Sequence, residues 1–173
     1  MKSTDDNLRR SKNLAYILRH DTESPFEPNG WLSVEYLTTQ KGYTLDEIVE
    51  IVSISNRRFE LSSDHRRVRA LYGHSVPIDL QMDSVKPPSV LYHGTSVDAM
   101  ERIMSEGLTS RSRTYVHLSS DEETAIKVGS RHGTAAVLTI AAERMYNDGY
   151  IFYHPGGRIW LVSEVLSQYL LFS

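Results

Sequence analysis

Cysteine is absent from the 173 residues of this chain. Its absence excludes a disulfide scaffold, a thiolate metal site and a cysteine nucleophile, and it suits a reducing compartment. Long apolar runs are absent too, because no stretch approaches the roughly 18 residues that indicate a membrane span. Residues 1–10 lack the apolar core of a secretory signal. We therefore expect a cytoplasmic protein with no membrane association.

Familiar metal and nucleotide motifs are also missing. The sequence has no His-Glu-x-x-His, Gly-x-Ser-x-Gly, Walker A or Gly-x-Gly-x-x-Gly pattern, and we expect no metal site. An excess of one charge sign is missing as well, because 19 Lys and Arg oppose 22 Asp and Glu. A net charge of −3 argues against a protein that binds nucleic acid over its whole surface.

The basic residues are instead concentrated. Five arginines lie between Arg57 and Arg69, and a second basic cluster ends at Arg19 and His20. Concentrated arginine in a nearly neutral protein favours one local anion site. The alternative is a solvated hairpin face that nearby acids balance.

With 40% hydrophobic and 24% charged residues, the chain has the composition of a soluble globular protein. Its length allows one domain or two small lobes. The first part predicts three helices and a hairpin. Ser33 is a suitable N-cap for a short helix ending at Gln40, and Thr44 with Glu47 forms a capping box. Three helices followed by a two-stranded ribbon predict a winged-helix lobe over residues 1–75.

Beyond this lobe the pattern changes. Residues 76–89 hold three prolines and little periodicity, and we interpret them as a linker. Residues 90–173 alternate short apolar strands with helices, which predicts a small α+β lobe and an α+β class overall. In the helix expected over residues 97–105, Met100 and Met104 are assigned to the core.

Four segments carry side chains suited to anion chemistry. They are Arg19-His20, residues 67–75, Tyr92-His93-Gly94-Thr95 and residues 128–133. Arginine grips phosphate through two hydrogen bonds, so converging arginines would hold a dianion. The glycines of these segments are expected to let a ligand approach the backbone. Each segment also has a plain structural interpretation, such as a cation at a helix C-terminus or a turn at a strand end.

Taken in order, these motifs resemble the RNA 2′-phosphotransferase family. The resemblance spans about residues 11–161 and rests on the following segments: Ser11-Lys12-x-Leu14, Leu18-Arg19-His20, Gly30-Trp31, Arg58-Phe59-Glu60-Leu61, Arg69-Ala70-x-x-Gly73-His74-Ser75, Leu91-Tyr92-His93-Gly94-Thr95, Val116-His117-Leu118-Ser119, Val128-Gly129-x-Arg131-x-Gly133 and Trp160-Leu161.

The resemblance implies an RNA-binding winged-helix lobe followed by a lobe like that of ADP-ribosyltransferases, which would bind NAD. The implied partners are NAD, consumed as a substrate, and a tRNA-like RNA bearing a 2′-phosphate. That phosphate would attack the nicotinamide ribose, and the ribose would then take the phosphate away as a cyclic phosphate. Nothing in the sequence suggests an obligate dimer, so we expect a monomer.

Site residues follow from the same resemblance. The implied catalytic residues are Arg19, His20, Arg69 and Arg131. Those implied for NAD are His93, Gly94, Thr95, His117 and Ser119. Those implied for RNA are Lys12, Arg67, Tyr72, His74 and Ser75.

One departure from the family pattern lies beside Arg69. The polar pair that usually follows Arg-Ala is replaced by Leu71-Tyr72, which puts local RNA or phosphate contacts in question. Two other functions stay open on the sequence. One is an ADP-ribosyltransferase that caps terminal phosphates of nucleic acid, and the other is a winged-helix DNA-binding regulator with a ligand-sensing lobe.

Overall fold

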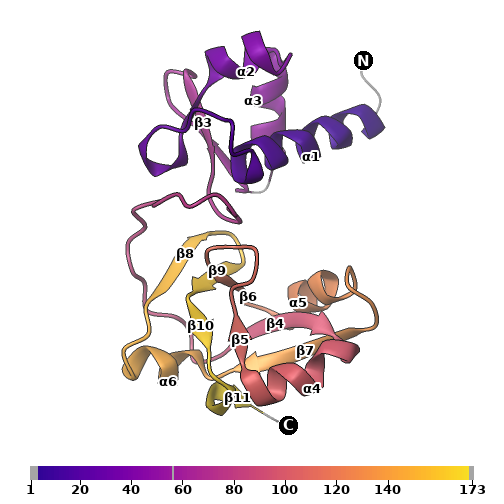
Figure 1. Ribbon diagram of the computed structural model, residues 1–173, viewed down its shortest axis with the longest axis vertical. Helices are drawn as coiled ribbons and strands as arrows, with labels where there is room; N and C mark the ends of the chain where they lie inside the picture. The colour runs from indigo at the N-terminus through magenta and orange to yellow at the C-terminus, as the bar shows by residue number, and fades with distance from the viewer. Residues whose placement is uncertain (1–3, 56, 172–173) are drawn as a thin grey trace. The chain divides into compact units, whose positions relative to one another are not determined.

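The computed structural model describes residues 4–55 and 57–171. The chain divides into two compact units, Met1–Gln81 and Met82–Ser173, each with its own hydrophobic core. Both units mix helices and strands, which confirms the α+β class (Figure 1). Within the described ranges, no helix combines the length and apolarity needed to cross a bilayer.

The first unit contains the three predicted helices and the predicted hairpin. In chain order its elements are α1 (Thr4–His20), a 3₁₀ turn η1 (Pro28–Gly30), β1 (Leu32–Ser33), α2 (Val34–Gln40), α3 (Leu45–Ser53), β2 (Phe59–Leu61) and β3 (Arg67–Ala70). Strand β1, which overlaps the short extended segment that the sequence indicates at Gly30-Trp31-Leu32, pairs with β3 to give a three-stranded antiparallel sheet of order β1-β3-β2.

Local sequence signals fix where the helices of this unit begin. The Ser33 hydroxyl accepts a hydrogen bond from the Tyr36 amide at 3.0 Å, which caps α2 as expected. The Thr44 hydroxyl accepts from the Glu47 amide, and the Glu47 carboxylate accepts from the Thr44 amide, so the predicted capping box is confirmed. Each such cap satisfies backbone donors that the first turn of a helix leaves unpaired.

The hairpin has one face toward the core and one toward solvent. Val68 and Ala70 of β3 are fully buried, whereas Arg67 and Arg69 point to the opposite face. This alternation follows from the two-residue period of a strand. It places the two arginines side by side on the outer surface of the sheet.

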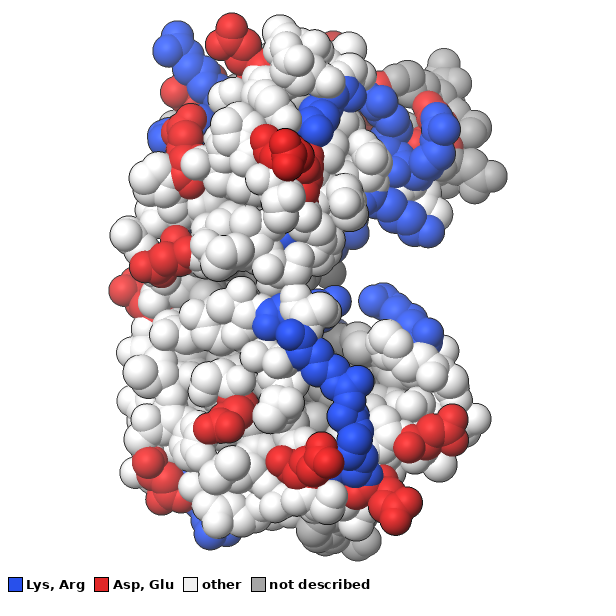
Figure 2. Space-filling model, viewed as in Figure 1, with Lys and Arg blue, Asp and Glu red and all other residues white. Residues whose placement is uncertain are grey.

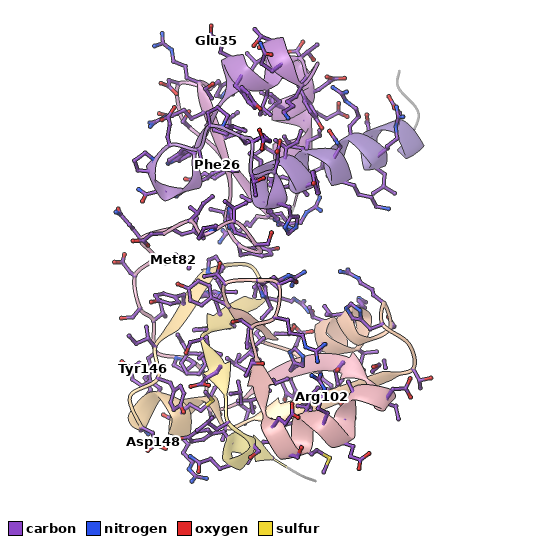
Figure 3. All side chains as sticks on the ribbon, in the orientation of Figure 1. Phe26, Glu35, Met82, Arg102, Tyr146 and Asp148 are labelled. Carbon is purple, nitrogen blue, oxygen red and sulfur yellow. The ribbon has the colours of Figure 1, made fainter. Side chains whose placement is uncertain are left out.

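The second unit holds the remaining elements, and Met82 at its start is labelled in Figure 3. They are β4 (Leu91–Ser96), α4 (Val97–Glu106), β5 (Leu108–Thr109), β6 (Val116–Ser119), α5 (Glu122–Gly129), β7 (Ala135–Ile140), α6 (Ala142–Asn147), β8 (Phe152–Gly156), β9 (Ile159–Val162), β10 (Glu164–Val165), a 3₁₀ turn η2 (Ser167–Tyr169) and β11 (Leu170–Leu171). The main sheet has the order β11-β7-β4-β6-β9-β8, and β5 pairs separately with β10.

The centre of the six-stranded sheet is split. Strand β4 pairs with β7 along its whole length but pairs with β6 only through Tyr92 and Ser119. Beyond that pair, the His93 ring bonds to the His117 carbonyl, with Nδ1 and O 3.0 Å apart. A side chain therefore spans β4 and β6 at a place where no ladder pair is formed.

Met104 is 44% exposed and does not belong to the core, because α4 turns Ile103 inward instead. The boundaries 1–75, 76–89 and 90–173 stay a prediction, and their outermost residues lie outside the described ranges. Within residues 76–89, Val85 donates a backbone hydrogen bond to Phe152 of the second unit at 2.9 Å.

Candidate functional site

The first unit gathers several predicted site residues at the C-terminal end of α1. His20 and Ser75 are joined by a 2.8 Å hydrogen bond between Nδ1 and Oγ. The amide of Ser75 also donates to the Arg19 carbonyl at 3.0 Å. The segment after β3 therefore binds to the last turn of α1, where helix carbonyls lack partners within the helix.

Arg19 is packed among aromatic rings and a glycine. Its Cζ lies 5.1 Å from the centre of the Tyr72 ring and 5.6 Å from that of Phe59. Gly73 adopts a φ of +88°, and a Cβ added there would lie 3.3 Å from Arg19 Nε. Tyr72, where this chain departs from the family pattern, thus supports the guanidinium through a cation–π contact.

His74 is buried beside this cluster, with 3% of its surface exposed. Burial lowers the pKa of His74 from 6.5 to about 4, and the nearby charges of Arg19 and His20 act in the same direction. The folded protein therefore holds His74 as a neutral imidazole at physiological pH.

This shift predicts a loss of stability in mild acid. Because the unfolded chain binds a proton near pH 6.5 and the native His74 does not, the free energy of unfolding should fall by about 2 kcal/mol between pH 7.5 and pH 5. Urea titrations at both pH values measure it. His74→Gln should lose this part of the pH dependence, whereas the exposed His65→Gln should keep it. Equal slopes for His74→Gln and wild type would contradict the assignment.

Arg69 lies on the outer face of the hairpin in a fixed environment. Its Nε and Nη2 donate to Glu60 Oε2 at 2.7 and 2.6 Å, and its Nη1 donates to the Asn29 carbonyl at 3.3 Å. The next residue, Gly30, is close to His74, since a Cβ built on it would lie 3.5 Å from Nε2. The turn at Pro28–Gly30 therefore contacts both Arg69 and the surroundings of His74.

The other residues expected to bind RNA lie on the surface of the same unit. Lys12 is exposed on α1. Arg67 is exposed on β3, with its Cζ 5.4 Å from the centre of the Trp31 ring and its Nη1 3.5 Å from Glu27. Neither residue is held as closely as Arg69.

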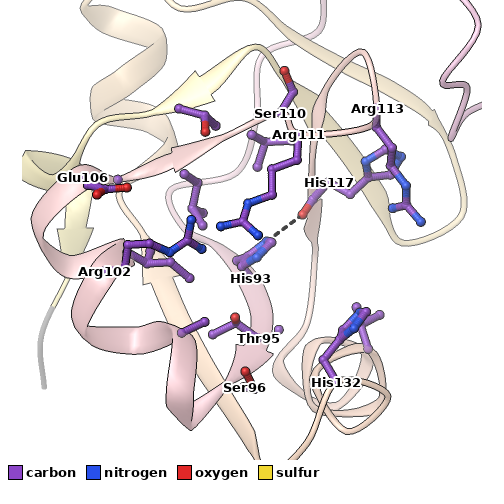
Figure 4. A pocket seen from close by; sticks show the side chains of 18 of the residues that line it. His93, Thr95, Ser96, Arg102, Glu106, Ser110, Arg111, Arg113, His117 and His132 are labelled. Atoms are coloured by element: carbon purple, nitrogen blue, oxygen red, sulfur yellow. Dashed lines mark hydrogen bonds between the residues drawn. The ribbon is translucent and has the colours of Figure 1, made fainter.

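The second unit contains a cavity of about 370 Å³ beside the split in the sheet. His93, Gly94 and Thr95 line it from β4, and His117 lines it from β6 (Figure 4). Burial lowers the pKa of His93, although its hydrogen bond to the His117 carbonyl opposes the shift and His132 adds to it. The cavity is therefore lined by the neutral imidazole of His93 and by backbone groups at the end of strand β4.

Arginines that the sequence interpretation missed complete this cavity. Arg102 comes from α4, and Arg111 and Arg113 come from the loop between β5 and β6. Figure 4 shows Arg102 and Arg111 pointing toward His93. In Figure 2, basic side chains form a band across the visible face of this unit. The run Ser-Arg-Ser-Arg at 110–113 is a sequence signal for Arg111 and Arg113, because clustered arginines favour the binding of anions.

The glycines near the cavity have a packing role. A Cβ on Gly94 would overlap the Ala125 carbonyl and lie 2.9 Å from the Gly129 amide nitrogen. A Cβ on Gly129 would lie 2.5 Å from the Thr95 carbonyl oxygen. The close backbone approach expected at these glycines is thus made by α5 against β4, within the protein itself.

Gly94→Ala should therefore damage folding. The clash is with backbone atoms that cannot rotate away, and overpacking of a core typically costs about 1–3 kcal/mol. Thermal and urea unfolding should both show the loss. Gly149→Ala is the comparison, because a Cβ there meets nothing within 4 Å and only its φ of +98° opposes substitution. A Gly94→Ala protein as stable as wild type would contradict the packing argument.

Two predicted residues lie away from the cavity lining. Ser119 is buried, at 5% exposure, and pairs with Tyr92 in the sheet. Arg131 is exposed just after α5, with its amide bonded to the Val128 carbonyl. The predicted meeting of Arg131 with Arg19 and Arg69 joins residues of different units, and it stays a prediction.

The chain is thus a two-unit α+β protein with an arginine–histidine cluster in one unit and an arginine-lined cavity in the other. The model of the RNA 2′-phosphotransferase, Tpt1/KptA family, matches residues 5–164. The chain therefore belongs to this family.

Full-length relatives carry the same family name. A protein of Rhodopirellula baltica is 43% identical, with 99% of each chain covered. One of Flavobacterium johnsoniae is 42% identical over 94% of each chain, and one of Hahella chejuensis is 41% identical over 93% of this chain and 91% of the relative. Each is named "Probable RNA 2′-phosphotransferase".

Proposed function

We propose that this chain removes an internal 2′-phosphate from RNA and transfers it to NAD. The products would be RNA with a free 2′-hydroxyl, ADP-ribose 1″,2″-cyclic phosphate and nicotinamide. The observation that carries the proposal is the second-unit cavity, where His93 and Thr95 lie opposite Arg102 and Arg111. Family membership supplies the RNA 2′-phosphate as the other substrate.

The cavity supports NAD on chemical grounds. Its size falls in the range of small-molecule sites, which is roughly 300–1,000 Å³. Arg102, Arg111 and Arg113 supply fixed cations that suit a pyrophosphate, and Glu106 is the acid beside them. Backbone groups at the end of β4 suit the hydroxyls of a ribose. The arrangement also supports the proposal that this unit resembles an ADP-ribosyltransferase lobe.

The first unit supports a role in RNA binding. Its order of helix, strand, two helices and two strands, with the sheet order β1-β3-β2, agrees with the proposed winged-helix lobe. Arg19, His20 and Ser75 come together from segments far apart in the chain, as a phosphate site requires. Such convergence would hold the 2′-phosphate by charge-assisted hydrogen bonds.

In the first proposed step, an oxygen of the 2′-phosphate attacks C1″ of the nicotinamide ribose. The C1″–N bond breaks, and nicotinamide leaves with the bonding electrons as a neutral molecule. No general base is needed, because a phosphate dianion is already a nucleophile at neutral pH. The task of Arg19, Arg69 and Arg131 is to offset the charge of two anionic substrates and to orient the attacking oxygen.

In the second step, the ribose 2″-hydroxyl attacks phosphorus and gives its proton to solvent water. The bond between phosphorus and the RNA 2′-oxygen breaks, and that oxygen takes up a proton. We assign this proton to His20, through Nε2, since Nδ1 is bonded to Ser75. The hydrogen bond to Ser75 fixes the plane of the ring for the transfer.

NAD binding tests the second-unit assignment separately from catalysis. NAD at 100 times its dissociation constant should stabilise the protein by about 2.7 kcal/mol, which thermal unfolding detects. Arg111→Gln should reduce the shift, because it removes a cation that points into the cavity. Arg158→Gln, a cation of the same unit that pairs with Asp121, is the matched control. Absence of any shift with saturating NAD would contradict the proposal.

The reaction itself is tested with an oligonucleotide that carries one internal 2′-phosphate. Loss of the phosphate should require NAD and should release one nicotinamide for each phosphate removed. Loss of phosphate without NAD would overturn the proposed chemistry and leave the family assignment intact.

A further inference from the structure

A row of three side chains crosses the outer face of the three-stranded sheet in the first unit. Glu60 on β2 pairs directly with Arg69 on β3, and Trp31 precedes β1 on the other side of β3. The indole ring lies under the guanidinium, with Arg69 Cζ 4.5 Å from its centre. The register of the sheet therefore sets Glu60 opposite Arg69, and the indole of Trp31 covers the same guanidinium from the other side of β3.

The contacts of Arg69 define its orientation on three sides. Glu60 Oε2 accepts hydrogen bonds from the edge formed by Nε and Nη2, and the Asn29 carbonyl accepts one from Nη1. The Trp31 ring covers one face of the guanidinium. Among the described residues, these contacts leave further hydrogens on Nη1 and Nη2 for a ligand. A planar fork held in this way is preorganised to bind a phosphate with its outer edge.

We infer that Glu60 is a positioning residue that aims Arg69 at the RNA 2′-phosphate. The inference rests on the proposed function, in which Arg69 binds that phosphate. Glu60 itself does not touch the substrate. Its carboxylate fixes the rotation of the guanidinium before RNA binds, so that less freedom is lost in the transition state.

A contribution of Glu60 to stability alone would look different. Glu60 is 44% exposed, and ion pairs with exposed partners contribute little to stability. Glu60→Gln is isosteric and should therefore fold. It also removes a negative charge close to a bound phosphate, which on its own would strengthen RNA binding. Positioning therefore predicts a lower kcat, whereas simple charge repulsion predicts tighter RNA binding without a loss of kcat.

The chain offers a matched control in Glu27. This residue is also 44% exposed and also pairs with an arginine that contacts Trp31, but its partner is Arg67 and the distance is 3.5 Å. Glu27→Gln changes the net charge by the same amount on the same surface. It leaves the two short hydrogen bonds between Glu60 and Arg69 in place.

Steady-state kinetics with a 2′-phosphorylated RNA and saturating NAD test the inference. Glu60→Gln should lower kcat by about tenfold, as expected when a catalytic group loses its alignment. Its KM for RNA should stay level or fall, and Glu60→Asp should restore part of kcat. Glu27→Gln should keep the wild-type kcat. An unchanged or raised kcat in Glu60→Gln, or an equal loss in Glu27→Gln, would overturn the inference.

Arg69→Ala separates this inference from the proposed function. If Arg69→Ala reduces turnover and Glu60→Gln does not, the positioning role is wrong and the function of Arg69 stands. If Arg69→Ala has wild-type activity, the phosphate-binding role fails and the inference about Glu60 fails with it.

Discussion

His20→Ala is expected to make the reaction intermediate accumulate. The first step needs no proton transfer, whereas the second must expel an RNA hydroxyl, which is a poor leaving group at neutral pH. Loss of a general acid typically slows a step by roughly 10²–10⁴. The first step would then be faster than the second, and RNA joined to ADP-ribose through its 2′-phosphate would accumulate.

A time course resolved by denaturing gel and mass spectrometry measures this result. Ser75→Ala is a milder variant for comparison, because it keeps the His20 imidazole and removes only the 2.8 Å hydrogen bond that orients this ring. It should slow the second step less than His20→Ala does. If His20→Ala consumes substrate slowly and the adduct is never visible, His20 binds phosphate only and is not the acid.

Arg69→Ala is expected to slow the whole reaction by about tenfold to a hundredfold. The change removes a charge-assisted contact to the phosphate, worth about 1.5–3 kcal/mol. It also leaves the carboxylate of Glu60 without its cation, next to the incoming anion. Both effects act before the first step, so no adduct should accumulate.

Nicotinamide release under single-turnover conditions measures the effect of Arg69→Ala on the first step. Arg66→Ala is the control, because Arg66 is exposed in the hairpin turn and its substitution removes the same charge from the same segment. Equal rates of release in Arg69→Ala and wild type would contradict the role of Arg69, as would adduct accumulation in this variant.

Local sequence signals predicted the helices well because caps act within one turn. The capping box at Thr44 and Glu47 and the N-cap at Ser33 lie where the sequence placed them. The shortest strands were missed for the opposite reason. Leu108 pairs with Val165, far along the chain, and two-residue strands have no period of their own. Their existence depends on the tertiary fold.

The motifs named residues that the structure places in two groups. Arg19 and His20 lie beside Ser75, and His93 with Thr95 lines a cavity, while their roles toward phosphate and NAD stay predictions. The contribution of Arg102 could not be predicted, because it depends on how α4 folds beside β4, whereas the clustered arginines at 110–113 were a signal for Arg111. Gly94 could not be assigned from its motif alone, because a glycine there is compatible with close approach of a ligand and with close packing of a helix.

The fate of the RNA 2′-phosphate distinguishes the proposed reaction from simple phosphate hydrolysis and from ADP-ribosylation of RNA. A 2′-phosphate labelled with heavy oxygen is incubated with the full chain and NAD, and all products are identified by mass spectrometry. We expect the label in ADP-ribose 1″,2″-cyclic phosphate, together with free nicotinamide and RNA with a 2′-hydroxyl. Label found in inorganic phosphate, or kept on a stable ADP-ribosylated RNA as the end product, would contradict the proposed reaction.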